Sequence, residues 1–208
     1  MTFQGGGKLR PFFLLSVSLE KSVLEKRLCS HEGEFLHVYA RNCEVRRILK
    51  PLAAEFLSRY HGLGSTSCRY AYGLFGKKEG NEGARHEPLR EGTVVAVSTF
   101  SGARHIPVEA LGGTKFIKSY EWVRYASLPD VRVIGGMGKT LKHFIGEVHP
   151  EDVMSYAMVE PWKEDALAIG VAGVQSTGDA YLKLGFTLEG KKAFPGGESL
   201  KFRLKLTY

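Results

Sequence analysis

The stretch Val133-Ile134-Gly135-Gly136-Met137-Gly138-Lys139-Thr140-Leu141 decides the predicted fold. A β-rich segment ends at its start, and the residues after its glycines recur at the spacing of a helix face, as Leu141, Phe144, Ile145 and Val148. Pro150 then ends the helix. A glycine turn between a strand and a helix is a general anion cradle, because backbone N–H groups point outward at the positive end of the helix dipole.

Two well-known phosphate-binding motifs do not fit this turn. A P-loop needs a glycine five residues before Gly138, where the chain has Val133, and the Rossmann GxGxxG pattern is not present. Lys139 adds positive charge, and glycines at 136 and 138 would let a pyrophosphate approach the backbone. A tight turn without a ligand is the alternative interpretation.

The segments around the turn predict alternating strands and helices. Pro51 divides the helical pattern between Val45 and Tyr60 into two pieces, with Pro51 in the first turn of the second piece. The turn residue Gly185 closes a short predicted helix over 180–184. Strands are predicted over 35–39, 69–75, 93–100, 120–127, 153–159, 187–194 and 200–206, with 69–75 and 93–100 adjacent and antiparallel.

Size and composition favour one domain. The 208 residues are 43% hydrophobic and 11% aromatic, which suffices for one substantial core. We expect residues 1–34 to be an N-terminal extension and 35–208 the domain. No apolar run is long enough to span a membrane, and three cysteines without CxxC spacing fit reduced thiols in a cytoplasmic protein. The seven histidines show no metal-ligand spacing, so no metal is expected, whereas a net charge of +7 favours an anionic partner.

Two motifs together resemble the GCN5-related N-acetyltransferases (GNAT). Gly136-x-Gly138 before an apolar helix resembles the acetyl-CoA-binding motif Q/R-x-x-G-x-G/A, although Val133 stands at the Gln/Arg position and Arg132 lies one step earlier. The segment Ala180–Phe186 resembles the family's Y-x-x-x-G-F segment. The order of predicted elements also matches. The resemblance implies an α/β (α+β) fold whose central sheet is mixed, mostly antiparallel and twisted, with flanking helices.

The same resemblance implies a cofactor, acetyl-CoA or another acyl-CoA, and roles for individual residues. Tyr181 would protonate the departing thiolate, or else only pack its helix onto the sheet. Glu121 would accept the amine proton, since strict alternation places it on one face with Val123, Tyr125 and Ser127; His105 and Asp165 are alternatives, and an exposed strand-end glutamate without a role is another. The expected cofactor-binding residues are Tyr125, Ala126, Ser127, Val133, Ile134, Gly135, Gly136, Met137, Gly138 and Lys139.

A patchy similarity to phage GNAT-like proteins, including the Mom type that modifies DNA adenine, suggests an acceptor. Its segments are Phe56–Gly64, Arg69–Phe75, Tyr120–Tyr125, Val133–Gly136 and Tyr181–Phe186. DNA phosphates would then contact basic residues and an extruded base would stack on aromatic ones. The alternatives are a small amine, a protein amine, or a binding module without catalysis; monomer and homodimer both remain open. Candidate acceptor residues are Arg69, Arg104, His105, Lys115, Lys118, Ser155, Tyr70, Tyr72 and Trp122.

Overall fold

A computed structural model describes residues 35–77, 90–110, 112–129, 131–158, 177–194 and 197–206. The described part of its main sheet has eight strands, of which seven follow one path and β5 (Arg104–Ala110) pairs with β6 (Gly113–Ser127) beside that path. Among these described strands, only β6 and β8 (Asp152–Met158) pair in parallel, so the sheet is mixed and mostly antiparallel, as predicted. The path runs β2 (Cys43–Arg47), β3 (Tyr70–Gly76), β4 (Val94–Phe100), β6 (Gly113–Ser127), β8 (Asp152–Met158), β10 (Gly197–Lys205) and β9 (Thr187–Phe194).

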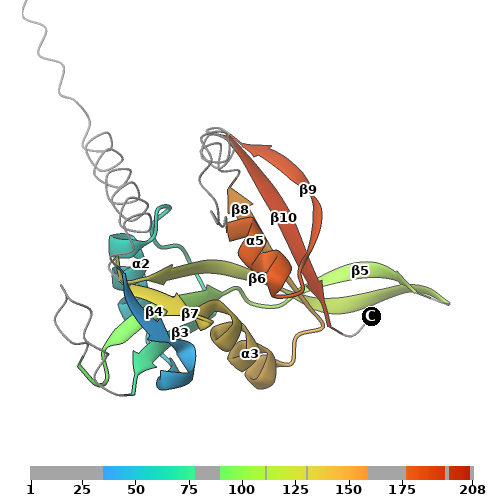
Figure 1. Cartoon of the computed structure of the whole chain (residues 1–208). Helices are drawn as coiled ribbons and strands as arrows, with labels where there is room; N and C mark the ends of the chain where they lie inside the picture. Colours follow the sequence, from blue (N-terminus) through green and yellow to red (C-terminus); the bar gives the residue numbers. More distant parts are fainter. Residues whose placement is uncertain are drawn as a thin grey trace, which may run out of the picture.

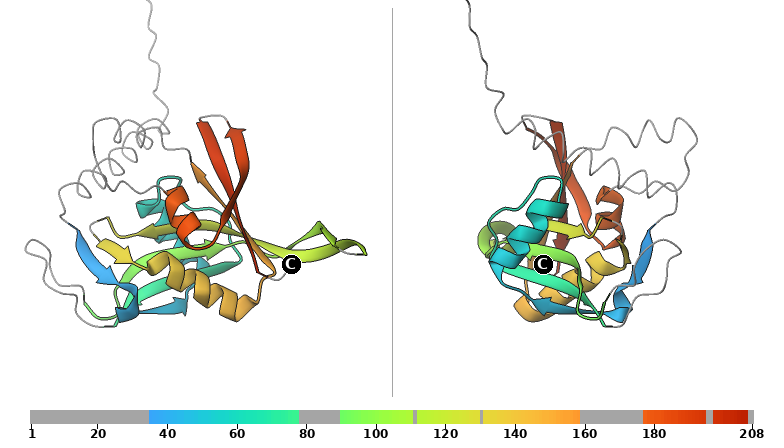
Figure 2. Two further views of the ribbon diagram at one scale, coloured as in Figure 1. Left: turned by 45° about the vertical axis from the view of Figure 1, so that its right-hand side comes forward. Right: turned by 90° about the vertical axis from the view of Figure 1, so that its left-hand side faces the viewer.

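Helices cover the two faces of this sheet (Figures 1 and 2). On one face, α2 (Lys50–Tyr60) buries Ala53 and Leu57 against Val97 and Ala126 of the sheet. On the other face, α3 (Gly136–Val148) and α5 (Thr177–Lys183) belong to a larger aromatic cluster. Burial of these aromatic rings is the main driving force for packing the helices on this face.

A second, two-stranded sheet lies beside the start of α3. β1 (Leu36–Tyr39) pairs in parallel with β7 (Val131–Ile134), and the 3-10 turn η1 (Ala40–Asn42) connects β1 to β2. Leu36 and Val38 are buried while His37 and Tyr39 are exposed, which is the alternation that predicted the first strand.

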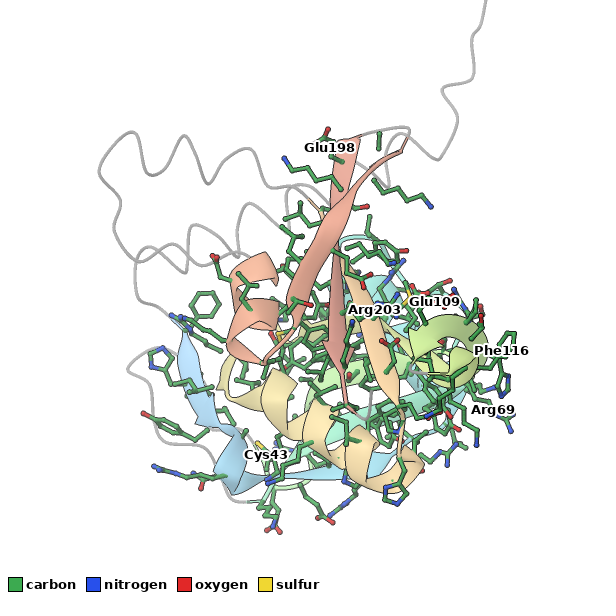
Figure 3. All side chains as sticks on the ribbon, turned by 90° about the vertical axis from the view of Figure 1, so that its right-hand side faces the viewer. Cys43, Arg69, Glu109, Phe116, Glu198 and Arg203 are labelled. Carbon is green, nitrogen blue, oxygen red and sulfur yellow. The ribbon has the colours of Figure 1, made fainter. Side chains whose placement is uncertain are left out.

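β5 and the first half of β6 form a two-stranded ribbon that projects from the body of the molecule (Figures 1 and 2). Ile117 on one face of the ribbon is fully buried, whereas Phe116 on the other face is 63% exposed. Figure 3 shows Phe116 and Glu109 at the edge of the molecule. The sequence prediction began β6 at residue 120 and did not foresee this ribbon.

Residues 45–47 were predicted as the start of a helix, and that prediction is wrong, because residues 43–47 are a strand. They form β2, which pairs with β3 from Cys43 opposite Gly76 to Arg47 opposite Tyr72. Cys43 and Val45 are both buried and lie two residues apart, which is the spacing of one face of a strand. Val45 also fits the helical spacing of the residues after it, so the sequence pattern allows both structures. The second piece is confirmed, since α2 has Pro51 in its first turn.

The remaining predicted elements lie close to their expected places. The strands of 69–75 and 93–100 are adjacent and antiparallel as β3 and β4, and Gly185 follows α5 with a φ of 88°. Residues 1–34 and Asp165 lie outside the described residues. Of the described helices, none is long and apolar enough to cross a membrane.

Candidate active site

Strands β6 and β8 meet at one end and separate at the other. They pair over four positions, from Ser119 with Asp152 to Trp122 with Ser155. Beyond Trp122, β6 stays with β4 and β8 stays with β10, and Figure 1 shows the two strands diverging. In the described part of the chain, the facing edges of residues 123–127 and 156–158 form no further β6–β8 pairs. A wedge therefore opens inside the sheet: its closed end is the Ser119–Asp152 pair, and the open end begins at its apex, where Trp122 pairs with Ser155.

A β-bulge in β6 lies at the start of this divergence. Thr99 of β4 faces Arg124, and Phe100 faces Trp122, so Val123 is an extra residue in β6. An extra residue bends its strand and increases the local twist. The bulge therefore accounts for the separation of β6 from β8 at this point.

The bulge also corrects the predicted faces of β6. Trp122 and Tyr125 lie on the same face, toward α3, with ring centroids 6.2 Å apart. Glu121 precedes the bulge and lies on the opposite face from Trp122. The prediction that Glu121 shares a face with Tyr125 and Ser127 is therefore wrong, because strict alternation does not hold across Val123.

The closed end of the wedge is held by a buried ionic network. The Arg203 Nη1 atom lies 2.7 and 2.8 Å from the two carboxylate oxygens of Asp152, which is fully buried. Ser119 hydrogen-bonds Asp152, and Arg203 also binds Glu189. Although burial opposes it, hydrogen bonding to Asp152 and Glu189 raises the pKa of Arg203. The network ties β6, β8, β9 and β10 together, and Figure 3 shows Arg203 in the centre of the molecule.

Tyr181 of α5 reaches the apex of the wedge. Its hydroxyl lies 2.7 Å from the Ser155 Oγ atom, and that Oγ atom lies 2.8 Å from the Trp122 carbonyl oxygen. The Trp122 and Phe202 rings pack against the tyrosine, with centroids 5.6 and 5.4 Å away. Tyr181 and Ser155 are 5% and 1% exposed. Ser155, predicted to contact the acceptor, is instead buried beneath Tyr181.

The surroundings of Tyr181 favour its protonated form. Burial raises its pKa to about 12, while the Ser155 hydrogen bond and the charge of Arg124 oppose this rise and the charge of Glu121 adds to it. Glu121 itself pairs with Arg104, whose Nη2 atom lies 2.9 Å from its carboxylate. Tyr181 is thus a neutral hydroxyl donor at physiological pH.

The glycine turn begins α3 as predicted, with Gly135 as its N-cap at a φ of 76°. This left-handed conformation favours glycine. The N–H groups of Gly136, Met137 and Gly138 have no acceptor within the helix, because the first bond of the helix joins the Lys139 N–H to the Gly135 carbonyl, at 3.0 Å. The positive end of this 13-residue helix thus has three amides without a partner inside the helix, and of these residues Gly136 is buried while Met137 and Gly138 are half-buried.

Gly136 and Gly138 have a packing role that the sequence argument missed. A Cβ atom at Gly136 would lie 2.3 Å from the Tyr125 hydroxyl and 2.7 Å from Val133 Cγ1. At Gly138 it would lie 3.1 Å from Leu184 Cδ2. Glycine at 136 therefore lets α3 begin directly above β6.

Lys139 does not point freely toward the turn. Its Nζ atom lies 2.7 Å from the Ala40 carbonyl oxygen and 2.6 Å from that of Cys43. These contacts fix η1 against α3. Two other cations lie near the turn. Arg132 is exposed on β7, which leads into the turn. Arg41 stacks over Tyr39, and Tyr39 pairs with Ile134 at the end of β7.

Two buried donors beside the wedge lack partners. Among the described residues, the Trp122 Nε1 and Tyr125 hydroxyl groups are buried without a hydrogen-bond partner. Burial raises the pKa of Tyr125. Such groups are costly in a folded protein, and they are common at functional sites. Of the other predicted cofactor residues, Ala126 packs under α2 and Ile134 is 40% exposed.

The predicted nucleic-acid residues divide into two groups. Arg104 forms an ion pair with Glu121, and Lys115 forms one with Glu151. Arg69 and His105 make up the other group, and all four of these basic side chains are exposed. The aromatic candidates Tyr72 and Trp122 are at most 1% exposed and belong to the core. Within the described ranges, no group of three or more His, Cys, Asp or Glu side chains is arranged to hold a metal ion.

Comparison with known proteins finds similar structures only. No protein-family model matches the chain, and no curated protein sequence does. The spermidine/spermine N-acetyltransferase SpeG of Vibrio cholerae is similar over 80% of this chain and 94% of its own, at 9% identity and a TM-score of 0.48. Arabidopsis thaliana NAA60 in complex with acetyl-CoA is similar over 79% and 99%, at 9% identity and a TM-score of 0.49.

A third structure, a putative acetyltransferase of the GNAT family from Desulfovibrio desulfuricans, covers 78% of this chain and 98% of its own, at 14% identity and a TM-score of 0.44. Similarities of this size do not define a family or an activity.

Proposed function

We propose that this chain is an acyl-coenzyme A-dependent N-acyltransferase. One observation carries the proposal: a neutral, buried tyrosine hydroxyl lies at the apex of a wedge in the sheet, and an open helix N-terminus lies on the same face of that sheet. The wedge suits an extended chain, and the helix terminus suits a pyrophosphate. Coenzyme A joins these two chemical features in one molecule.

The residues present fit such a cofactor. The amides of Gly136, Met137 and Gly138 would hold the pyrophosphate, with Arg41 and Arg132 supplying positive charge in place of Lys139. Beyond the bulge, residues 124–126 of β6 pair with β4 on one side and not with β8 on the other, and this second edge would hydrogen-bond the pantetheine much as a neighbouring strand does. When bound, the cofactor supplies an acyl group as a thioester. The buried Trp122 Nε1 and Tyr125 hydroxyl donors beside this path support the assignment.

The protein's own groups provide the proton transfers. Tyr181 would donate its proton to the leaving sulfur, and its raised pKa supports a protonated tyrosine before that step. Glu121 lies on the opposite face of the sheet, where it would take the amine proton through water. Its ion pair with Arg104 must open for that role, because the Arg104 Nη2 atom lies 2.9 Å from the carboxylate oxygen.

The charge near Glu121 favours an anionic acceptor. Arg104 pairs with Glu121, and Arg124 lies on the same face of β6 with its Nε atom 3.3 Å from the Gly64 carbonyl oxygen. Exposed Arg69 lies nearby, since a Cβ atom placed on Gly102 would be 3.9 Å from the Cβ atom of Arg69. Three arginines beside one glutamate suit a nucleic acid better than a polyamine. We therefore propose an adenine amino group in nucleic acid as the acceptor.

An acceptor panel tests this proposal. The protein is incubated with acetyl-CoA and duplex DNA, spermidine or a lysine peptide, and thiol release and acylated products are measured by mass spectrometry. Acylated adenine is expected, and Tyr181→Phe should lower the rate about 100-fold or more, whereas the matched core change Tyr120→Phe should not. Acylation of spermidine or peptide alone would contradict the adenine acceptor. Acetyl-CoA binding without transfer to any acceptor would instead indicate a binding module.

A further inference from the structure

The hydrogen bonds around Ser155 have a fixed direction. The Ser155 Oγ atom lies 2.8 Å from the Trp122 carbonyl oxygen, and two oxygens at that distance need a hydrogen between them. A carbonyl carries none, so Ser155 must donate its only hydrogen to Trp122. The 2.7 Å contact between Ser155 and Tyr181 therefore uses the hydrogen of Tyr181. The order is Tyr181 to Ser155 to Trp122.

This order has a consequence for an acid at position 181. The only hydrogen of the Tyr181 hydroxyl is already donated to Ser155. The hydrogen bond from Tyr181 to Ser155 must therefore break before the Tyr181 proton can move to any group in the wedge. The oxygen that remains would be a buried phenolate, since the residue is 5% exposed. A buried charge without a hydrogen bond is costly.

We propose that Ser155 is the positioning residue of this acid: it holds the Tyr181 hydroxyl at rest and turns its own hydroxyl from the Trp122 carbonyl to the phenolate oxygen as the proton leaves. The inference rests on the proposed function. The acyl carbon would bond to the amine nitrogen as its C–S bond breaks, the electron pair of that bond would stay on sulfur, and the amine proton would go to Glu121 through water. The Tyr181 O–H bond breaks and an S–H bond forms, and the negative charge moves to the phenolate, which regains a proton from water.

Burial and acidity support the role of Ser155. Burial raises the pKa of Tyr181 to about 12, and the Ser155 hydrogen bond is the first of the effects that lower it. An ordinary thiol has a pKa of about 8.5, so proton transfer from this tyrosine to a thiolate is uphill without help. Ser155 is 1% exposed and cannot serve the acceptor directly. Its position suits stabilising the phenolate.

The first test measures Tyr181 without any ligand. Ionisation of Tyr181 is followed by NMR of tyrosine labelled with carbon-13 at Cζ, with Tyr181→Phe assigning the signal. Ser155→Ala should lower the phenolate fraction near pH 11.5 about tenfold, the size expected for one hydrogen bond to an ionised oxygen. Ser155→Thr, which keeps the hydroxyl, should restore it. An unchanged or larger phenolate fraction in Ser155→Ala would overturn the proposal, provided melting shows both variants folded.

The second test uses the coenzyme. Affinities of coenzyme A and desulfo-coenzyme A are compared at pH 9, where much of the thiol is ionised. The wild type should prefer coenzyme A, Tyr181→Phe should lose this preference, and Ser155→Ala should weaken it while Ser155→Thr keeps it. An equal preference in Ser155→Ala and the wild type would count against the role of Ser155. If neither compound binds the wild type, the proposed function fails. The NMR measurement of Tyr181 ionisation then tests the role of Ser155 by itself.

Discussion

The two ends of the β6–β8 wedge differ in how fully their polar groups are paired. At the closed end, Asp152 and Arg203 form a buried pair whose other contacts reach Ser119 and Glu189. At the open end, the Trp122 Nε1 and Tyr125 hydroxyl groups have no hydrogen-bond partner in the part of the chain that the structure describes, and the first amides of α3 have none within the helix. Both ends belong to one sheet and one aromatic cluster.

The difference indicates which end serves stability and which serves binding. A paired network inside a core holds strands together, because losing either member leaves a buried group unpaired. Unpaired buried donors cost stability, and a ligand that satisfies them is one explanation for their presence. Changes at the closed end should therefore mainly affect unfolding, and changes at the open end should mainly affect coenzyme binding.

The largest expected effect is at the closed end. Asp152→Asn removes the charge that balances buried Arg203, and the free energy of unfolding should fall by about 3 kcal/mol or more. Denaturant unfolding measures this loss. Glu44→Gln, which breaks the exposed pair with Arg46, is the control and should give no measurable change. Equal effects of the two changes would contradict the assigned role of the buried network.

Alkaline pH should destabilise the protein through its buried tyrosines. Burial raises the pKa of Tyr181 to about 12, from about 10 in an unfolded chain. Its contribution is fully present below pH 10 and is lost as pH rises through 12, which amounts to roughly 2 to 3 kcal/mol. The free energy of unfolding of Tyr181→Phe should therefore fall less between pH 9 and pH 12 than that of the wild type. A parallel decline in both would contradict the raised pKa.

Gly136→Ala tests the packing at the turn. Its Cβ would collide with the Tyr125 hydroxyl and Val133, so a loss of about 1 to 3 kcal/mol is expected. Gly146→Ala in the same helix is the control: nothing lies within 4 Å of its Cβ, and it should gain up to about 1 kcal/mol. Removing the closest clash with Tyr125→Phe should recover part of the loss. Without any recovery, the collision would not be the cause.

The smallest effect concerns the open end alone. Ile134→Glu adds a negative charge at an exposed residue beside the turn and should weaken acetyl-CoA binding about tenfold while leaving unfolding nearly unchanged. Leu52→Glu on α2 is the matched control, since Leu52 is 45% exposed on the other face of the sheet. Calorimetric titration with acetyl-CoA compares the two variants. Equal binding by both would place the coenzyme elsewhere.

The local signals predicted most of the secondary structure. Glycine and proline positions located the starts of α2 and α3 and the end of α5, because backbone constraints at these residues are local. The β2 strand was missed because Val45 fits a helical and a two-residue period equally well. Neighbouring strands, which the sequence pattern does not reveal, decided between the two periods.

The site was predicted in part. Tyr181 and the glycine turn were found from motifs, but the position of Glu121 depends on one extra residue at Val123, which is visible only in the register with β4. The contacts of Lys139 with η1 and of Ser155 with Tyr181 join residues far apart in sequence. No local pattern carries that information.

Calorimetric titration of the wild-type protein with acetyl-CoA tests the central claim most directly. A working cradle and wedge predict saturable binding of one acetyl-CoA per chain, with a matching rise in melting temperature. Ile134→Glu should weaken this binding and Asp152→Asn should not, where that variant remains folded. No heat of binding and no change in melting temperature at millimolar acetyl-CoA would contradict the account.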